Sequence, residues 1–390
     1  NNYHGIQFSP SSRYNMIINN EISNNEYSGL LISSDSNTIS NNVVSNNSIG
    51  IFLEANPDLI PSHCFNNTVA NNTLSNNRDY GIFLLFSSYN ILTNNTMNGN
   101  GFEVYGLDLS HYLHKIDPSN RLNGKPIYYL VSVKDEYLST STSYVAIVNS
   151  TNVVVENLTM SENDQGVLLA YSNNCRIENV TASNNYHGIF LHHSSNNILA
   201  NNNLLNNYNG FDEAALYLWY SGNNLIMNNN VSTSFYGIHL ESSSNNTITK
   251  NNISDNHFGV FFEYSDYNKI TNNNILNNSR GIFLESSRYN TITNNIVSKN
   301  NAEGILLWSS NINELANNTL MLNENHSLRL EFSDYNIIVN NNITENDCGI
   351  FLGAVCVNNT IYLNNFINNT ESYYSDPSST SNWNSSSPIT

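Results

Sequence analysis

The sequence predicts an all-β fold, a right-handed parallel β-helix (a solenoid) in which every coil of 22–23 residues forms short strands. The first observation is a repeat: the segments GIHLESSSNN (237–246), GVFFEYSDYN (259–268) and GIFLESSRYN (281–290) follow one another at this step. The second is composition, because about a fifth of the residues are asparagine, which favours turns over helix interiors. We expect about fourteen or fifteen coils, each contacting only its neighbours.

Each coil follows a pattern close to GIxLxxSxxNxIxNNxIxxN. Its apolar residues alternate inward, and Asn, Ser, Gly or Asp separate them, so every coil contains three short strands joined by tight turns. A leucine-rich repeat has a similar period, but it needs a helical or 3₁₀ segment between strands. The asparagines and serines between these strands disfavour that alternative.

Asparagines recur at fixed positions of the coil, and we expect their side chains to hydrogen-bond from coil to coil. This turn geometry explains the composition without any function. The predicted ladders are Asn251, Asn272, Asn294, Asn317 and Asn340; Asn256, Asn277, Asn300 and Asn346; and Asn246, Asn268, Asn290, Asn313 and Asn336.

The repeat divides the chain into four parts. Residues 1–109 form the first coils, and 144–370 continue the same solenoid. The segment 110–143 interrupts the repeat, and we expect it to pack over one face of the solenoid. Residues 371–390 are a Ser/Asn-rich tail. Shorter interruptions, within 55–64 and 209–213, are expected to lengthen two turns.

Charge and apolar content exclude several classes of partner. The formal net charge is −18 with only 13 Lys and Arg, which argues against DNA or RNA, because nucleic-acid affinity depends on clustered basic groups. No apolar run is long enough for a membrane helix, and no signal peptide opens the sequence. The four cysteines do not form a disulfide framework, although Cys348 and Cys356 fall in one coil and are candidates to pair.

The coil pattern, the segment RLNGKPIYYL (121–130) and the C-terminal IYLNNFINNT (361–370) with NWNSSSPIT (382–390) resemble NosD-like surface proteins of the parallel β-helix repeat superfamily. The resemblance covers nearly the whole chain. It implies a superfamily of carbohydrate-binding proteins and sugar hydrolases, and an archaeal, extracellular or cell-surface protein. NosD itself is named for a periplasmic accessory protein in copper delivery to nitrous oxide reductase. A copper role is not carried over, because the sequence has no Met-rich, CxxC or repeated His cluster.

Outward positions of the first strand of each coil form two stripes, and aromatic residues on them make a candidate face for glycan binding or assembly. Cover by the segment 110–143, a protein partner and sugar stacking remain as alternatives for this face. The candidates are Phe190, Tyr217, Trp219, Phe261, Phe283 and Trp308.

Three glutamates, Glu241, Glu263 and Glu285, occupy one outward position in consecutive coils. Stacked carboxylates repel each other, so we expect solvation, a raised pKa or a bound cation to relieve the cost. Ca²⁺ would prefer these oxygen ligands, and no other cofactor is expected. Metal binding is an alternative for the histidines His187, His192, His193, His239 and His257, but surface and turn positions explain them better. Sequons at Asn157, Asn179, Asn252 and Asn342 are candidate glycosylation sites.

Two functional hypotheses follow. The first is a non-catalytic extracellular or cell-surface structural protein, such as an S-layer, sheath or filament subunit or an adhesin, which assembles with itself or with other surface proteins through solenoid faces and ends. The second is a carbohydrate-active enzyme (a polysaccharide lyase, hydrolase or epimerase) or a glycan-binding module. The Glu positions give this second hypothesis little support, because any such ladder satisfies the carboxylate spacing of glycosidases.

Overall fold

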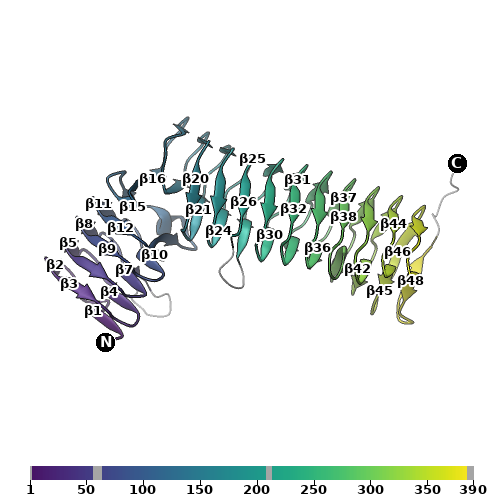
Figure 1. The fold of residues 1–390 in the computed structure, drawn as a ribbon, viewed down its shortest axis with the longest axis horizontal. Coiled ribbons are helices and arrows are strands. Elements are labelled where there is room, and N and C mark those ends of the chain that lie inside the picture. The colour runs from purple at the N-terminus through teal and green to yellow at the C-terminus, as the bar shows by residue number, and fades with distance from the viewer. Residues whose placement is uncertain (1, 56–63, 208–212, 384–390) are drawn as a thin grey trace. The chain divides into compact units, whose positions relative to one another are not determined.

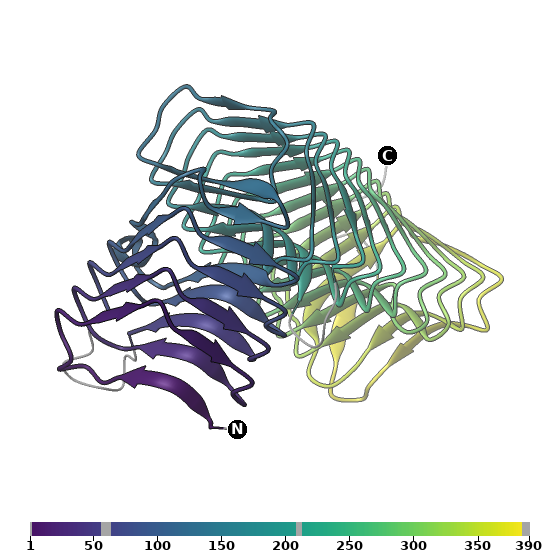
Figure 2. The ribbon, with the colours of Figure 1, turned by 60° about the vertical axis from the view of Figure 1, so that its left-hand side comes forward.

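The computed structural model describes residues 2–55, 64–207 and 213–383. The chain divides into two compact units, Asn1–Asn173 and Asn174–Thr390. Both units consist of short, mostly parallel strands stacked coil upon coil, as Figures 1 and 2 show. The lengthened turns expected within 55–64 and 209–213 lie almost wholly outside the described residues. No helix among the described residues is long and apolar enough to cross a membrane.

In the first unit, most coils contribute one strand to each of three parallel stacks, and the coil of β16 and β17 contributes only two. The first stack is β1 (His4–Phe8), β4 (Ser28–Ile32), β7 (Ile49–Glu54), β10 (Tyr80–Leu85) and β13 (Gly101–Tyr105), with β16 (Lys125–Val131), β18 (Tyr144–Val148) and β21 (Gln165–Ala170) in a second sheet. The next is β2 (Met16–Ile18), β5 (Thr38–Ser40), β8 (Thr68–Ala70), β11 (Ile91–Thr93) and β14 (Lys115–Ile116), with β17 (Tyr137–Leu138) pairing β19 (Val154–Glu156). The last is β3 (Glu21–Ser23), β6 (Val43–Ser45), β9 (Thr73–Ser75), β12 (Thr96–Asn98) and β15 (Arg121–Leu122), and β20 (Thr159–Ser161) follows later.

The second unit repeats this arrangement in its described residues. Its long strands are β24 (His187–His192), β27 (Ala214–Trp219), β30 (Tyr236–Glu241), β33 (Phe258–Glu263), β36 (Arg280–Glu285), β39 (Ile305–Trp308), β42 (His326–Glu331), β45 (Cys348–Leu352) and β48 (Glu371–Ser375). The second stack is β22 (Arg176–Glu178), β25 (Ile198–Ala200), β28 (Leu225–Met227), β31 (Thr247–Thr249), β34 (Lys269–Thr271), β37 (Thr291–Thr293), β40 (Glu314–Ala316), β43 (Ile337–Val339), β46 (Val357–Tyr362) and β49 (Thr380–Asn382). The third is β23 (Thr181–Ser183), β26 (Asn203–Leu205), β29 (Asn230–Ser232), β32 (Asn252–Ser254), β35 (Asn274–Leu276), β38 (Ile296–Ser298), β41 (Thr319–Met321), β44 (Asn342–Thr344) and β47 (Asn365–Ile367).

The core of each coil comes from the alternation of its strands. In the coil that begins at β30, Ile238 and Leu240 are fully buried, as are Ile248 of β31 and Ile253 of β32. Glycine at the start of the long strand is explained by close approach, since a Cβ at Gly281 would lie 2.4 Å from the carbonyl oxygen of Gly304 in the next coil. The coil pattern predicted from the sequence is therefore confirmed.

Buried asparagines stack into the ladders that the composition predicted. The Asn268 ladder is confirmed: the backbone N–H of Asn268 donates to the Oδ1 of Asn290 at 2.7 Å. The other two ladders were assigned one residue out of register at several coils. In the pair Asn272–Asn273, the second residue is buried and bonds to Asn295, whereas the first is exposed at φ 57°. A side chain at the left-handed residue points outward, so only its neighbour reaches the core.

The segment 110–143 belongs to the sheets instead of lying over a face. Its strands β14 and β15 pair in parallel with β11 and β12, and β16 pairs with β18. Asn123 and Gly124, both at positive φ, make the tight turn of an antiparallel hairpin between β15 and β16, the turn that an Asn-Gly pair favours.

The tail predicted at 371–390 also forms strands in its described part, because β48 pairs with β45 and β49 with β46. Together with 110–143 this raises the number of turns to about 17. The four cysteines are buried and free, so pairing of Cys348 with Cys356 is wrong. The thiol of Cys348 contacts the carbonyl oxygen of Ile350, and the thiol of Cys356 contacts that of Ala354.

Candidate metal-binding site

Three potential metal ligands converge on the outward face of β30 and β33. His239 and Glu241 are two residues apart on β30, so their side chains leave the same face of the strand. The parallel register places Glu263 of β33 directly beside Glu241. One ligand atom from each of His239, Glu241 and Glu263 lies within 4.8 Å of the other two.

The imidazole of His239 is held between aromatic rings. Tyr217 stacks on it at 4.8 Å between ring centroids and Phe261 at 4.9 Å, and Tyr236 lies 4.6 Å away. These rings leave His239 only 7% exposed, and in the part of the chain that the structure describes its buried Nε2 has no hydrogen-bond partner. Burial lowers the pKa of His239 to about 3, with a smaller effect from His187. The imidazole is therefore neutral and able to donate a lone pair at neutral pH.

Glu241 is positioned by a neighbouring hydroxyl. The Oη of Tyr217, one coil away on β27, donates a hydrogen bond to the Oε2 of Glu241. Hydrogen bonds of this kind orient a carboxylate without neutralising it, which suits a carboxylate that binds a cation.

Glu285, the third glutamate of the predicted ladder, continues the column on β36 beside Glu263 but is not part of the converging group. The column ends at indoles, since Trp219 precedes Glu241 in register and Trp308 follows Glu285. The three glutamates of the predicted ladder thus lie side by side on consecutive strands. The group of converging ligands, however, contains His239 and not Glu285.

The predicted aromatic face is more buried than expected. Phe190 is fully buried and Phe261 nearly so, because rings of consecutive coils stack on one another. Tyr217, Trp219 and Phe283 are half-buried, and Trp308 is exposed. Phe190 and Phe261 are therefore wrong as open stacking platforms.

Within the described residues, the other histidines named from the sequence do not join this group. His187 and His192 are buried, so the expectation that surface or turn positions explain them is wrong. His187 accepts a hydrogen bond from the backbone N–H of Ala214, and His192 stacks on Trp219 at 4.4 Å. Burial lowers the pKa of His187 to about 4 and of His192 to about 3. His193 stacks on Tyr220, and His257 is exposed.

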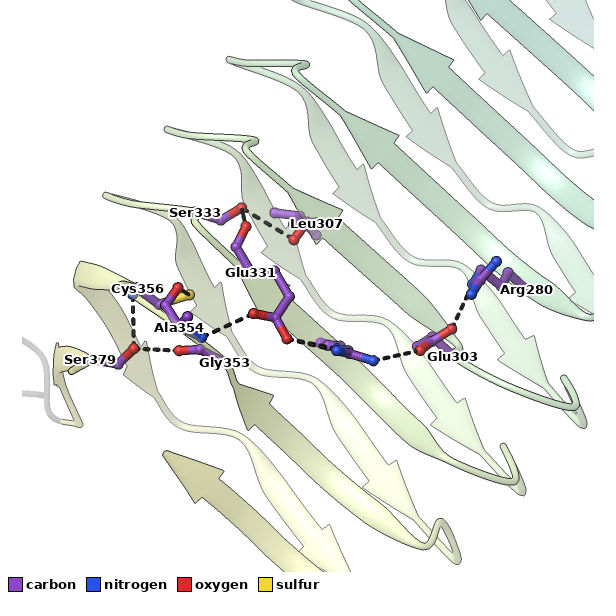
Figure 3. Close-up of polar contacts among 10 residues, drawn as sticks. Arg280, Glu303, Leu307, Glu331, Ser333, Gly353, Ala354, Cys356 and Ser379 are labelled. Atoms are coloured by element: carbon purple, nitrogen blue, oxygen red, sulfur yellow. Dashed lines mark hydrogen bonds and ion pairs between the residues drawn. The ribbon is translucent and has the colours of Figure 1, made fainter. Parts of the chain in front are cut away.

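An alternating ionic network covers the same sheet further along. Glu303 forms ion pairs with Arg280 at 2.8 Å and with Arg329 at 3.2 Å, and Arg329 also pairs with Glu331 at 2.7 Å. Figure 3 shows Glu303 facing Arg280, and Glu331 reaching the backbone N–H of Ala354. The two arginines are thus matched by two carboxylates.

The first unit contains a buried acid cluster. The hydroxyl of Tyr80 on β10 donates to Asp164 at 3.1 Å, and Glu103 on β13 hydrogen-bonds to both residues. Burial raises the pKa of Glu103 well above its usual range, and the nearby Asp164 raises it further.

The predicted sequons all lie at the surface. Asn157 and Asn179 are exposed turn residues at positive φ, Asn252 is exposed on β32, and Asn342 is half-buried on β44. Glycosylation of these positions stays a prediction.

His239 was not predicted as a ligand, because its partners come from two coils and are separated by 2 and 24 residues in the sequence. One signal was available: His239 occupies a slot that Phe261 and Phe283 fill in the next two coils. Because phenylalanine already packs well at this position, the imidazole indicates a role for its polar ring nitrogens.

Comparisons with known proteins agree on the fold. The family described as right handed beta helix region matches residues 1–65, which confirms the predicted right-handed parallel β-helix. No curated protein matches the chain. The family described as periplasmic copper-binding protein (NosD) matches residues 59–114, 110–280 and 213–390.

Several solved structures are similar at low identity. The periplasmic alginate epimerase AlgG is 15% identical, with a TM-score of 0.42 over 89% of this chain and 76% of that protein. The A-module of the Azotobacter vinelandii mannuronan C-5 epimerase AlgE6 is 14% identical, with a TM-score of 0.35 over 95% and 89%. A mutant tailspike protein of E. coli bacteriophage HK620 is 11% identical, with a TM-score of 0.44 over 85% and 71%.

The NosD matches together extend from residue 59 to residue 390, which is well over half of the chain. The predicted resemblance is confirmed, and the chain belongs to the NosD family, described as periplasmic copper-binding proteins.

Proposed function

We propose that the chain is a non-catalytic extracytoplasmic protein that binds a divalent transition-metal ion, copper(II) in the first place, at His239, Glu241 and Glu263. The observation that carries this proposal is the buried Nε2 of His239, which has no hydrogen-bond partner among the described residues, while one oxygen of each of two carboxylates lies within 4.8 Å of a ring nitrogen. A buried polar atom without a partner is costly, and a bound ion would remove that cost.

The ligand chemistry selects the oxidation state. Imidazole nitrogen and carboxylate oxygen suit copper(II), whereas copper(I) prefers thiolate and thioether sulfur. All four cysteines are buried away from this group, and burial raises the pKa of Cys64 and Cys348. The residues at this site therefore fit copper(II), with zinc as the chief competitor.

Calcium on the Glu ladder, which the sequence predicted, is a weaker match to this group. Ca²⁺ takes six to eight oxygen ligands, and a neutral imidazole contributes none. A calcium site would instead use Glu263 and Glu285. Calcium binding would therefore require Glu285, whereas copper binding would not.

The carbohydrate-active alternative receives less support from the geometry. Lyase or epimerase chemistry on uronic acids needs a cation free to neutralise the substrate carboxylate. The arginines on this face, Arg280 and Arg329, are each paired with a glutamate. A structural role in a surface assembly is compatible with metal binding.

The proposal is tested by titrating the metal-free protein with Cu²⁺, Zn²⁺ and Ca²⁺ in separate calorimetric experiments. We expect Cu²⁺ to bind with one-to-one stoichiometry at this site. The substitution His239→Phe restores the residue type of the neighbouring coils, so it should preserve the fold while weakening Cu²⁺ binding at least about 100-fold, the cost expected for a lost ligand. Glu263→Gln should weaken it similarly.

Glu285→Gln is the matched control, because it removes a carboxylate one coil beyond the group. We expect Cu²⁺ affinity to change less than about threefold in this variant, as for a charge that is near the ion but not bound to it. Preference for Ca²⁺, with loss of binding in Glu285→Gln but not in His239→Phe, would replace the proposal by the calcium alternative. No binding of any of the three ions to the wild-type protein would refute both.

A further inference from the structure

Bulky apolar side chains gather at one turn of the second unit, the turn that leaves the long strands. Seven of them are between 40% and 61% exposed and lie in four consecutive coils, from the coil of β33 to the coil of β42. We call this set the apolar ridge. It consists of Tyr264, Tyr267, Tyr289, Trp308, Ile312, Phe332 and Tyr335.

Six of these seven residues adopt the left-handed backbone conformation, with φ between 48° and 59°. Asparagine and glycine tolerate this region, whereas aromatic residues do so poorly and a β-branched residue such as Ile312 is an outlier. At the turn position of Tyr267, Tyr289, Ile312 and Tyr335, the preceding coils use Asn196, Asn223 and Asn245. The ridge therefore occupies positions where asparagine would fit the backbone better.

The ridge is unfavourable for the isolated unit in two ways. Its backbone is strained, and its rings are exposed to water although they contact one another. Tyr267 and Tyr289 stack at 4.7 Å, and Trp308 meets Phe332 at 5.5 Å between centroids, yet all four remain at least 40% exposed. Neither folding nor solubility accounts for such residues, which indicates a surface that is covered in a complex.

The size of the ridge fits a protein interface. Large aromatic side chains bury about 150–250 Å² each, so seven half-exposed ones offer roughly 600–800 Å². That is close to the roughly 800 Å² per partner of a standard-size interface. Its composition also fits, because tyrosine, tryptophan and phenylalanine are enriched at interface cores and charged residues are depleted.

The spacing of the ridge identifies the partner. Successive ridge residues stand on hydrogen-bonded turns of neighbouring coils, for example Tyr267 on the turn that bonds to Arg288 and Tyr289 on the turn that bonds to Asn311. They therefore repeat at the strand spacing of about 4.8 Å. Only a surface with the same axial repeat can interdigitate with such a row over four coils, and a second copy of this chain provides one.

Charge around the ridge makes this contact depend on salt. Asp266 and Asp334 lie between the rings, but each accepts a backbone N–H, from Arg288 and Val357 respectively. The net charge of −18 repels two copies at long range, and salt screens that repulsion. Association through the ridge should therefore strengthen as ionic strength rises.

We propose that the apolar ridge is the interface through which two copies of this chain associate side by side, with their ridges antiparallel about a two-fold axis. This proposal is independent of the metal site. It assigns a self-association surface to residues that the sequence pattern alone places in turns.

The test is sedimentation equilibrium of the full chain at 0.15 and 0.5 M salt, over a range of concentrations. The variant carries Tyr267→Asn, Tyr289→Asn, Ile312→Asn and Tyr335→Asn together. Asparagine is the residue of the equivalent turns in other coils, so the variant should fold at least as well as the wild type, which circular dichroism and thermal unfolding will verify. Leu363→Asn is the control, since Leu363 is also exposed and at positive φ, but lies on a different turn.

We expect the wild-type protein to dimerise, more tightly at the higher salt concentration. The quadruple variant should weaken dimerisation at least about 100-fold, as for the loss of two or more interface hot spots. Leu363→Asn should leave dimerisation unchanged. A wild-type protein that stays monomeric at both salt concentrations would overturn the proposal, as would a folded quadruple variant that dimerises like the wild type.

Discussion

Asn273 uses both ends of its side-chain amide inside the solenoid. Its Oδ1 accepts hydrogen bonds from the backbone and side chain of Asn251 at 2.9 and 3.0 Å, and its Nδ2 donates to the carbonyl of Ile248 at 2.9 Å. Two coils are thereby joined through one buried side chain. The neighbouring Asn272 is exposed and serves the turn backbone, at φ 57°.

These two asparagines should respond differently to the same substitution. Asn273→Ala leaves several buried polar groups without partners and should lower stability by about 2–4 kcal/mol. Asn272→Ala retains those bonds and should cost about 1 kcal/mol, from left-handed strain alone. Thermal unfolding followed by circular dichroism measures both. Equal effects of the two substitutions would contradict the assignment of Asn273 to the buried ladder.

Glu103 makes stability depend on pH in the first unit. Burial, followed by the charge of Asp164, raises the pKa of Glu103, so the folded chain keeps a proton that the unfolded chain releases. Stability should therefore fall as pH rises from the unfolded pKa towards the folded one.

Glu103→Gln mimics the protonated carboxyl and should raise stability at neutral pH by about 1 kcal/mol, the scale of a typical single substitution. The benefit should vanish near pH 4, where the glutamate is protonated in both states. Melting temperatures of both proteins between pH 4 and 9 provide the measurement. A benefit that grows towards acid pH would show that the sign is wrong.

At the scale of elements, the network around Arg329 joins three successive coils. Glu303 is buried beside Arg280 and Arg329, and Glu331 also pairs with Arg329. Burial would raise the pKa of Glu303, but the hydrogen bond and charge of Arg280 and the charge of Arg329 lower it. The pairing therefore stabilises the fold above the unfolded pKa of glutamate, and this contribution is lost as pH falls through the folded pKa.

Arg329→Met should destabilise the second unit by about 2–4 kcal/mol at neutral pH, because it leaves buried carboxylates without their shared cation. Arg78→Met is the control: Arg78 pairs with Asp79 at the surface, and its loss should cost no more than about 1 kcal/mol. Thermal unfolding at pH 7 and pH 3 compares them, and the Arg329→Met penalty should shrink at pH 3. A penalty that persists at pH 3 would mean that Arg329 acts through packing.

The strands were predictable because each coil repeats the same inward positions, as Ile238 and Leu240 illustrate. Which asparagine of each pair is buried could not be predicted, since Asn272 and Asn273 have the same side chain and differ only in backbone conformation. The segment 110–143 was misplaced because its strands depart from the coil pattern, although they pair in register. Glu241 and Glu263 were found from their equal positions, but burial of His239 results from rings on two other coils, which no single strand reveals.

At the scale of the whole molecule, each coil contacts mainly the coils before and after it, so a local event stays within its unit. A ligand that binds the native state raises stability by mass action. Cu²⁺ bound at His239 should therefore protect the second unit selectively against unfolding. Hydrogen exchange in the presence and absence of the ion should show slower exchange in β27, β30 and β33, with little change in β4 to β10. Equal protection of both units would contradict a single site in the second one.

Electron paramagnetic resonance of the protein loaded with one equivalent of Cu²⁺ shows whether one imidazole and two carboxylates form a copper(II) site, because nitrogen couplings count the imidazoles bound to the ion. We predict a single bound copper with coupling to one histidine nitrogen, which disappears in His239→Phe and persists in Glu285→Gln. A spectrum with several histidine nitrogens, or one that is unchanged in His239→Phe, would contradict this site.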